Sequence, residues 1–315
     1  MIYRRLRQMG VLGINRRNID LTSRHNPRRL YPLVDNKLRT KAMCIGAGIP
    51  VPRLLAKAEH HFELEELMGR VDGLDDFVMK PARGAMGNGI VVITGRTERL
   101  FSRTGSRRMS RGDLQFHAAS ILSGLYALGG NDDMAMVEER LVVHPEFRSI
   151  AYDGVPDVRV IVYRGYPVMA MARLPTKASS GRANLHQGAI GVGLDMATGT
   201  MQSAVRHNAP LEIHPDTGER LIGRRLPNFE RVLQIAVAAA EITGLGYLGA
   251  DVVVDARHGP VILELNARPG LAIQLCNRAG LLPRLATVDR IADMPRDATG
   301  RLTMVKELAD LWTRD

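Results

Sequence analysis

The sequence is poor in cysteine and in aromatic residues. Among its 315 residues there are two cysteines, and phenylalanine, tryptophan and tyrosine together make up 4%. Two cysteines cannot build the disulfide framework of a small secreted protein, so the cytoplasm is the expected compartment. The few aromatic residues form no recognisable RNA-binding motif, which argues against base stacking as the main activity and against a nucleic-acid partner.

Long apolar runs and familiar nucleophile patterns are also missing. No apolar stretch approaches the roughly 20 residues of a membrane-spanning helix. The basic start, residues 1–7, is not followed by the apolar region of a signal peptide. No serine, cysteine and histidine set has a recognisable catalytic spacing. Cys44 and Cys276 stand among apolar residues, so we expect them to be small buried hydrophobes rather than nucleophiles.

Negative charge is scarce near the N-terminus, and the chain carries a formal net charge of +10. Arginines dominate the first 30 residues: Arg4, Arg5, Arg7, Arg16, Arg17, Arg24, Arg28 and Arg29. A second basic group lies in a serine- and glycine-rich stretch expected to be an exposed loop: Arg99, Arg103, Arg107, Arg108 and Arg111. An acidic protein or peptide acceptor or an anionic membrane surface would suit such charge. A merely solvated surface explains it equally well.

Residues 249–270 predict a β-hairpin that carries three oxygen ligands. Alternation along the second strand places Glu264 and Asn266 on one face, with leucines on the other. An even loop would bring Asp251 to that face, opposite Asn266 or opposite Glu264, whereas an odd loop would turn it away. Two carboxylates and an amide suit Mg²⁺ that also binds substrate phosphates. Acids on a strand face are, however, often only solvated.

Residues 77–93 predict a glycine-rich loop between two short strands. Lys80 ends the first strand, and Gly84, Gly87 and Gly89 follow. Glycines let backbone N–H groups approach a phosphate chain, and the lysine supplies a positive charge. Because a strand follows instead of a helix, neither a P-loop nor a dinucleotide fingerprint fits. The loop is expected to be a β-hairpin lid, although a plain hairpin turn would show the same glycines.

Residues 134–143 predict an apolar strand interrupted by Glu138 and Glu139. In a nucleotide site, such a strand can present backbone N–H and C=O groups to the edge of an adenine. Apolar strands that end in charged residues are common, so this motif is weak by itself.

In this order, the motifs resemble the ATP-grasp superfamily and, within it, the RimK-like α-L-glutamate ligases. The resemblance covers about residues 35–285. Its motifs are residues 35–39 (DNKLR), 79–84 (MKPARG), 137–141 (VEERL), 157–159 (DVR), 182–188 (RANLHQG), 249–251 (GAD) and 263–270 (LELNARPG). It implies an α+β ATP-grasp fold in which two α/β lobes with antiparallel sheets sandwich ATP.

The resemblance also implies a role for each matching residue. The ATP phosphates would contact Lys37 and Lys80, beneath a lid formed by the loop from Arg83 through Gly84 and Gly87 to Gly89. The adenine hinge would comprise Glu138, Glu139 and Leu141, with Asp157 near the ribose. One or two Mg²⁺ ions, or Mn²⁺ in their place, would be held by Asp251, Glu264 and Asn266. The γ-phosphate and the acyl phosphate would be surrounded by Arg159, Arg173, Arg182, Asn184 and Arg268.

The implied activity is that of an ATP-dependent carboxylate–amine ligase. A carboxylate takes the γ-phosphate, and an amine then displaces phosphate to form an amide. Glutamate or another amino acid would be joined to a peptide, protein or amino-acid amine. A different acid and acceptor pair, or a non-catalytic nucleotide-binding basic adaptor, are the alternatives. For His186 and Lys177, a role in the site and a plain surface position are both open interpretations. The sequence is also compatible with a homo-oligomer.

The motifs divide the chain into four parts. Residues 1–35 are expected to form a basic N-terminal extension, 36–145 a small lobe with the glycine-rich lid, 146–285 a large lobe with the magnesium site, and 286–315 a helical tail. Helices are expected over residues 113–128, from an N-cap at Asn228 to an end at Gly244, and over residues 304–312. Many members of the resembled family have a complete α/β domain before the first lysine motif, and this sequence has no room for one.

Overall fold

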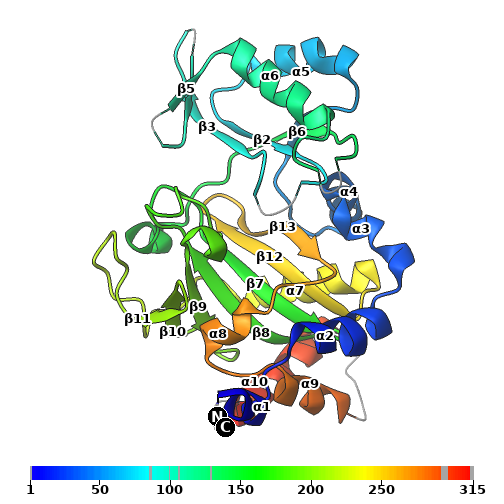
Figure 1. The fold of residues 1–315 in the computed structure, drawn as a ribbon, viewed down its shortest axis with the longest axis vertical. Coiled ribbons are helices and arrows are strands. Elements are labelled where there is room, and N and C mark those ends of the chain that lie inside the picture. The colour runs from blue at the N-terminus through cyan, green and yellow to red at the C-terminus, as the bar shows by residue number, and fades with distance from the viewer. Residues whose placement is uncertain are drawn as a thin grey trace.

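The computed structural model describes residues 2–84, 87–98, 100–105, 107–127, 130–291 and 297–312. Two antiparallel sheets form two lobes, one above the other (Figure 1). The sheet of the small lobe has the strand order β1-β6-β2-β3-β4-β5, and that of the large lobe β11-β10-β9-β8-β7-β12-β13. Each lobe has a main apolar core of its own.

The small lobe consists of one sheet covered on one face by two helices (Figure 1). Its strands are β1 (Leu54–Ala58), β2 (Phe77–Pro81), β3 (Val91–Arg96), β4 (Phe101–Arg103), β5 (Arg107–Met109) and β6 (Ala135–Glu138). Its helices are η3 (His61–Glu63), α5 (Leu64–Val71) and α6 (Arg111–Leu122). We expected α6 to extend to residue 128. It ends earlier because Gly124 adopts the left-handed conformation, with φ +74°, which stops a helix.

The large lobe is built around the seven-stranded sheet. Its strands are β7 (Asp157–Tyr163), β8 (Tyr166–Leu174), β9 (Ile190–Leu194), β10 (Met201–Arg206), β11 (Ala209–Leu211), β12 (Tyr247–Asp255) and β13 (Gly259–Asn266). Helices η4 (Pro145–Ile150), η5 (Leu185–Gln187), α7 (Phe229–Thr243), α8 (Ala272–Asn277), α9 (Leu282–Asp289) and α10 (Ala298–Trp312) complete it. Helix α7 packs on β7, β12 and β13. Asn228 stands at its N-cap position, as predicted, but in the left-handed conformation and without a capping hydrogen bond from its side chain.

The hairpin of β12 and β13 differs from the prediction in its loop and its register. Asp255 pairs with Gly259, so the turn has the odd length that we expected to send Asp251 to the wrong face. A register shift follows: Val252 pairs with Ile262, but Asp251 pairs with Glu264. The extra residue of this β-bulge reverses the effect of the odd turn, so both acids still share one face. Our rule about loop length was therefore wrong, although Asp251 and Glu264 share a face as predicted.

The N-terminal segment packs against the large lobe. It consists of α1 (Ile2–Gln8), α2 (Ile14–Arg16), η1 (Arg17–Ser23), η2 (Arg28–Leu30) and α3 (Pro32–Asp35), and α4 (Lys37–Gly46) follows. The buried side chain of Asn26 donates to the carbonyls of Tyr247 and Ala267 and accepts from the amide of Tyr247. The amide of Leu12 donates to Gln274 on α8. We expected an extension, and these contacts make the segment part of the large-lobe core.

At the base of the large lobe, the segment that follows α1 contacts the start of α9, where the amide of Leu282 donates to the carbonyl of Gly10 (Figure 1). Helix α10 begins at Ala298, earlier than the predicted start at Met304. Residues 292–296 and 313–315 of the predicted tail lie outside the described residues. In the part of the chain that is described, no helix combines the length and the apolar character needed to cross a membrane.

Both cysteines are buried and unpaired, as predicted. Burial raises the pKa of the Cys44 thiol to about 11 and that of Cys276 to about 12. Both thiols therefore stay protonated near neutral pH and are poor nucleophiles.

Candidate active site

A cluster of two lysines and one glutamate lies beneath the small-lobe sheet, and we call it the lysine cluster. Glu138 ends β6, and its carboxylate lies 2.6 Å from Lys80 Nζ and 2.9 Å from Lys41 Nζ. Lys80 comes from β2, and Lys41 from α4, where it also donates to the carbonyl of Pro52. All three side chains are at most 6% exposed. The cluster thus ties α4, the sheet and the linker between the lobes together.

The lysine cluster holds more positive than negative charge. Burial alone would raise the pKa of Glu138, but Lys80 and Lys41 together outweigh it and hold that pKa below the usual value. At Lys41, burial prevails over the attraction of the shared glutamate and lowers the pKa. The two shifts agree with one anion serving two cations. An additional anion at this place would be stabilised.

Lys37 connects the small lobe with the large one. It is the first residue of α4, whose N-terminus is capped by the Asn36 side chain. Its Nζ donates to the carbonyl of Gly84 over 2.6 Å and lies 3.7 Å from Glu264 Oε1. Lys37 therefore lies between the glycine-rich loop and strand β13.

The glycine-rich loop joins β2 to β3, which pair as an antiparallel hairpin. Gly87 and Gly89 have φ of +75° and +73°, so side chains at these positions would be strained. A Cβ at Gly84 would lie 2.2 Å from a side-chain carbon of Pro81, so only glycine fits there. The amide of Arg83 donates to Asp133 and its guanidinium to the carbonyl of Asp132. Residues 85 and 86 of the predicted lid lie outside the described residues.

A second charged cluster lies on the large-lobe sheet, and we call it the arginine–aspartate cluster. Arg159 on β7 donates to both oxygens of Asp251 on β12, each over 2.7 Å. Arg173 on β8 lies 2.9 Å from Asp251 Oδ2, and both its Nε and its Nη2 donate to Asp157 on β7. Cross-strand pairing causes these contacts, because Asp251 faces Arg159 and Asp157 faces Arg173 in the register of the sheet.

Positive and negative charges are equal in the arginine–aspartate cluster. Burial opposes the charge of Asp251, but Arg159 and Arg173 overcome it and lower its pKa to about 2. Burial raises the pKa of Asp157 to about 6, since Arg173 offsets it only in part and the charge of Asp251 adds to it. Asp157 thus lies beside Asp251, and its predicted position near a ribose stays a prediction.

The three predicted metal ligands lie at the end of the β12–β13 hairpin that is remote from its turn. Asp251 faces Glu264, and Asn266 lies two residues further along β13, facing Gly249. Glu264 is 33% exposed, whereas the amide nitrogen of Asn266 is buried without a hydrogen-bond partner among the described residues. No group of three histidine, cysteine, aspartate or glutamate side chains in the described part could hold a metal. The predicted set has two carboxylates and one amide, and these oxygen donors fit Mg²⁺.

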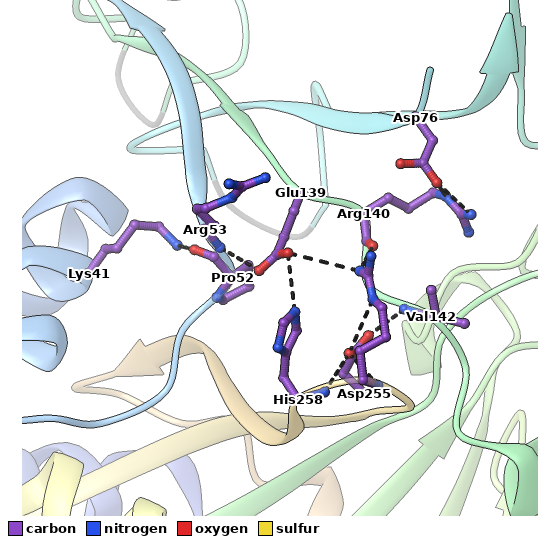
Figure 2. Close-up of polar contacts among 10 residues, drawn as sticks. Lys41, Pro52, Arg53, Asp76, Glu139, Arg140, Val142, Asp255 and His258 are labelled. Atoms are coloured by element: carbon purple, nitrogen blue, oxygen red, sulfur yellow. Dashed lines mark hydrogen bonds and ion pairs between the residues drawn. The ribbon is translucent and has the colours of Figure 1, made fainter. Parts of the chain in front are cut away.

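The strand that leaves the small lobe forms the hinge, and Figure 2 shows its polar contacts. Glu139 accepts from the backbone amide of Arg53 over 2.7 Å and lies 3.2 Å from His258 Nε2 in the β12–β13 turn. Asp255 accepts from the amide of Val142 over 2.5 Å. The hairpin is therefore bonded near its turn to the connection at residues 139–142, and Glu139 in turn links that connection to Arg53 on the other one.

The predicted hinge residues thus have different surroundings. Glu138 lies in the lysine cluster, and Leu141 packs against Val253 and Val261 on the large-lobe hairpin. Glu139 borders an open cleft of about 480 Å³ together with Pro50, Val51, Arg53, Arg257, His258 and Val261. The apolar group around Leu141 is itself buried, so a contact between Leu141 and an adenine stays a prediction.

The remaining predicted residues lie on loops of the large lobe. Arg182 and Asn184 precede β9. The Arg182 side chain is exposed, and the Asn184 side chain accepts from the amide of His186. Both His186 and Lys177 are exposed. Arg268 follows β13, and its guanidinium lies 5.3 Å from the centre of the Tyr31 ring. None of these contacts joins the arginine–aspartate cluster, so their roles at the γ-phosphate stay predictions.

Lys41 is the member of the site that we did not predict. It stands four residues after Lys37 on α4, and residues at this spacing share one face of a helix. That spacing was the signal in the sequence that could have indicated Lys41. The role of Lys41 depends on Glu138, which is distant in the sequence and contacts Lys41 only in the folded chain.

The chain matches the family described as sugar-transfer associated ATP-grasp over residues 16–290, and it belongs to that family. A probable alpha-L-glutamate ligase of Maridesulfovibrio salexigens is 25% identical over 270 residues, which cover 86% of this chain and 64% of that protein. A second one, from Thioalkalivibrio sulfidiphilus, is also 25% identical, with the same coverage. The chain thus spans less than two thirds of the length of these relatives.

Among solved structures, the ATP-grasp ligase PsnB with its minimal precursor aligns with a TM-score of 0.44 and 17% identity, over 84% of this chain and 61% of PsnB. A D-alanine–D-alanine ligase of Bacillus anthracis aligns with a TM-score of 0.42 and 14% identity, over 90% and 70%. The family match and the two antiparallel sheets confirm the predicted ATP-grasp fold and α+β class.

Proposed function

We propose that this chain is an ATP-dependent carboxylate–amine ligase that binds ATP between its two lobes. One observation carries the proposal: the buried lysine cluster has two cations for one acid, and Lys37 links the small lobe to Glu264 on β13, which faces Asp251 on β12. Excess positive charge on one side of a cleft and carboxylates on the other suit a phosphate chain with a divalent cation. Family membership supports the same conclusion.

The small lobe would bind the nucleotide. Lys80 contacts the phosphates, and Lys41 keeps Glu138 from neutralising it completely. The glycine-rich loop covers the phosphate chain and offers its backbone N–H groups. Leu141 would lie beside the adenine, and the backbone of the hinge would supply hydrogen bonds to its edge.

The large lobe would bind the metal. Asp251, Glu264 and Asn266 provide its oxygen ligands, and Mn²⁺ could take the place of Mg²⁺. When bound, such an ion neutralises charge that develops on the transferred phosphoryl group. Arg159 and Arg173 lie beside these ligands, and Arg182, Asn184 and Arg268 on the neighbouring loops would complete the positive surroundings.

The reaction would proceed without a nucleophile from the protein. A substrate carboxylate attacks the γ-phosphorus, the bond to ADP breaks, and an acyl phosphate forms. An amine then attacks the acyl carbon, and phosphate leaves as the amide forms. Positioning and positive charge supply most of the rate in phosphoryl transfer, which agrees with a site rich in arginine and lysine.

The substrates proposed are glutamate, or another amino acid, and the amine of a peptide, a protein or an amino acid. The name of the similar proteins, probable alpha-L-glutamate ligase, supports glutamate. An acidic acceptor would suit the basic surface of the chain. The cytoplasm stays a prediction from the two unpaired cysteines, as do the division into two lobes with flanking segments and any self-association.

The test is Mg²⁺-dependent phosphate release from ATP, measured with a panel of amino acids and acidic peptides. We expect release to require one acid and one amine and to fall about 100-fold or more in Glu264→Ala, which loses a metal ligand. Glu212→Ala, at an exposed acid of the same lobe, is the matched control. A chain that binds ATP and Mg²⁺ without turnover on any pair would favour the non-catalytic alternative. A chain that does not bind ATP at all would refute the proposal.

A further inference from the structure

Each of the two proposed metal carboxylates already has a cation as its partner. Arg159 occupies both oxygens of Asp251, each over 2.7 Å, and Lys37 Nζ lies 3.7 Å from Glu264 Oε1. Arg159 and Lys37 are also the residues expected to contact the phosphates of ATP. The same two cations therefore have two competing sets of anionic partners, one on the protein and one on the nucleotide.

The charges around the metal ligands are balanced before anything binds. Three acids and three bases are in direct contact: Asp157, Asp251 and Glu264 with Arg159, Arg173 and Lys37. Both aspartates are almost completely buried. A divalent cation that entered this group alone would leave two uncompensated positive charges in a poorly solvated place, which is unfavourable. A triphosphate that enters with it supplies the missing negative charge.

The contacts also indicate which arginine can change partner. Arg173 pairs with both Asp157 and Asp251, so it keeps one acid if it loses the other. Arg159 forms an ion pair with Asp251 and with no other acid in the described part of the chain. Moving Arg159 to a phosphate therefore frees Asp251 on that side, while Arg173 and Asp157 remain paired.

We propose that Arg159 and Lys37 are exchangeable counterions of the metal site. In the empty cleft they hold Asp251 and Glu264. When nucleotide enters, they pass to its phosphates and leave the two carboxylates to the divalent cation. The cation then binds tightly only together with nucleotide. This inference rests on the proposed function, because it assumes that ATP occupies the cleft.

The test is a titration of the full chain with Mn²⁺, in which the electron paramagnetic resonance signal measures the free ion. Each protein is titrated with and without a non-hydrolysable ATP analogue. We expect wild type to bind Mn²⁺ at least about tenfold more tightly with the analogue. Arg159→Gln should bind Mn²⁺ alone about tenfold more tightly than wild type, because one competing cation is gone.

Two further variants make the result specific. Arg206→Gln removes the same charge from β10, a more distant strand of the same sheet, where the guanidinium donates to the carbonyl of Gly188, and should bind Mn²⁺ like wild type. Arg159→Lys keeps a positive charge beside Asp251, so it should bind Mn²⁺ alone nearly as weakly as wild type does. Lys37→Gln, on α4, should also bind Mn²⁺ alone more tightly than wild type. This variant replaces Arg159→Gln in the test if Arg159→Gln fails to fold.

Several results would overturn the exchange. One is a folded Arg159→Gln, with an unchanged unfolding temperature, that binds Mn²⁺ alone no better than wild type. Another is a wild type that binds Mn²⁺ equally tightly with and without the analogue, and a third is an equal gain in Arg206→Gln. If wild type does not bind the analogue at all, the proposed function fails. The comparison of variants in Mn²⁺ alone still decides whether Arg159 excludes the ion.

Discussion

The lysine cluster of the small lobe and the arginine–aspartate cluster of the large lobe differ in their balance of charges. The lysine cluster has one carboxylate for two cations, whereas the arginine–aspartate cluster has two of each. Both are nearly buried, so the difference does not come from solvent. An excess of one sign in a buried place favours a ligand of the other sign, while a balanced cluster favours its own closed set of contacts. The first cluster is suited to receive an anion, and the second must exchange partners before it can bind an ion.

The comparison predicts a large loss of stability when the single acid of the lysine cluster is removed. Glu138→Gln leaves Lys80 and Lys41 buried without a countercharge, which we expect to lower the free energy of unfolding by about 3–5 kcal/mol. Urea denaturation measures this loss. Glu66→Gln, at an exposed glutamate of the same lobe, should change the unfolding free energy by less than about 0.5 kcal/mol. A loss below about 1 kcal/mol in Glu138→Gln would contradict the comparison.

The same chemical change in the balanced cluster should have a smaller effect. Asp157→Asn leaves Arg173 paired with Asp251, and burial already disfavours the charge of Asp157. We expect a loss of about 1–2 kcal/mol in the free energy of unfolding, measured in the same urea experiment. If Asp157→Asn is as damaging as Glu138→Gln, the number of acids in a cluster does not set its tolerance.

Removing the surplus cation should weaken nucleotide binding more than it weakens the fold. Lys41→Met leaves a balanced pair of Lys80 and Glu138, so we expect about tenfold weaker binding of an ATP analogue, near 1.4 kcal/mol. The free energy of unfolding should stay within about 1 kcal/mol of wild type, because a buried charge gives way to an apolar chain of similar length. Calorimetry measures the binding, with the exposed Lys57→Met as the control. Unchanged affinity would show that the surplus charge has no role.

The clusters should also respond to acid in opposite directions. The pKa of Asp157 is about 6 in the folded chain, above its ordinary value of 3.8. As the pH falls, Asp157 therefore takes up a proton in the folded state before it does so in the unfolded state. Its protonation then stabilises the folded state increasingly between pH 7 and pH 5. Between these pH values, wild type should gain about 1 kcal/mol relative to Asp157→Asn. The pKa of Glu138 is lowered from 4.5, so its contribution is present above that pH and is lost below it. Urea titrations at several pH values measure both, and parallel pH curves for wild type and the two variants would refute this.

Local patterns in the sequence predicted the parts of the site that one segment can specify. The glycines of the loop, the alternation of β13 and the end of α7 at Gly244 each depend on a few neighbouring residues. The structure agrees with them because backbone conformation and strand alternation are local properties. Motif order then indicated the family, and the match over residues 16–290 confirms it.

Other features depended on distant contacts and were missed or misread. The β-bulge that brings Asp251 opposite Glu264 arises from pairing along the whole hairpin, so loop length alone could not reveal it. We predicted an extension for the N-terminal segment because it is rich in arginine. In the structure, Asn26 and Leu12 of this segment form buried hydrogen bonds with the large lobe.

By itself, the sequence determined the fold class, the glycine-rich loop and the identity of the acids on the hairpin, because short-range periodicity and residue chemistry are sufficient for these. Only the tertiary structure decided how the charges are paired. Glu138 meets Lys41, and Asp251 meets Arg159, across separations of 97 and 92 residues that only chain packing closes. Because electrostatic energy depends on distance and burial, the balance of each cluster is a property of the folded chain.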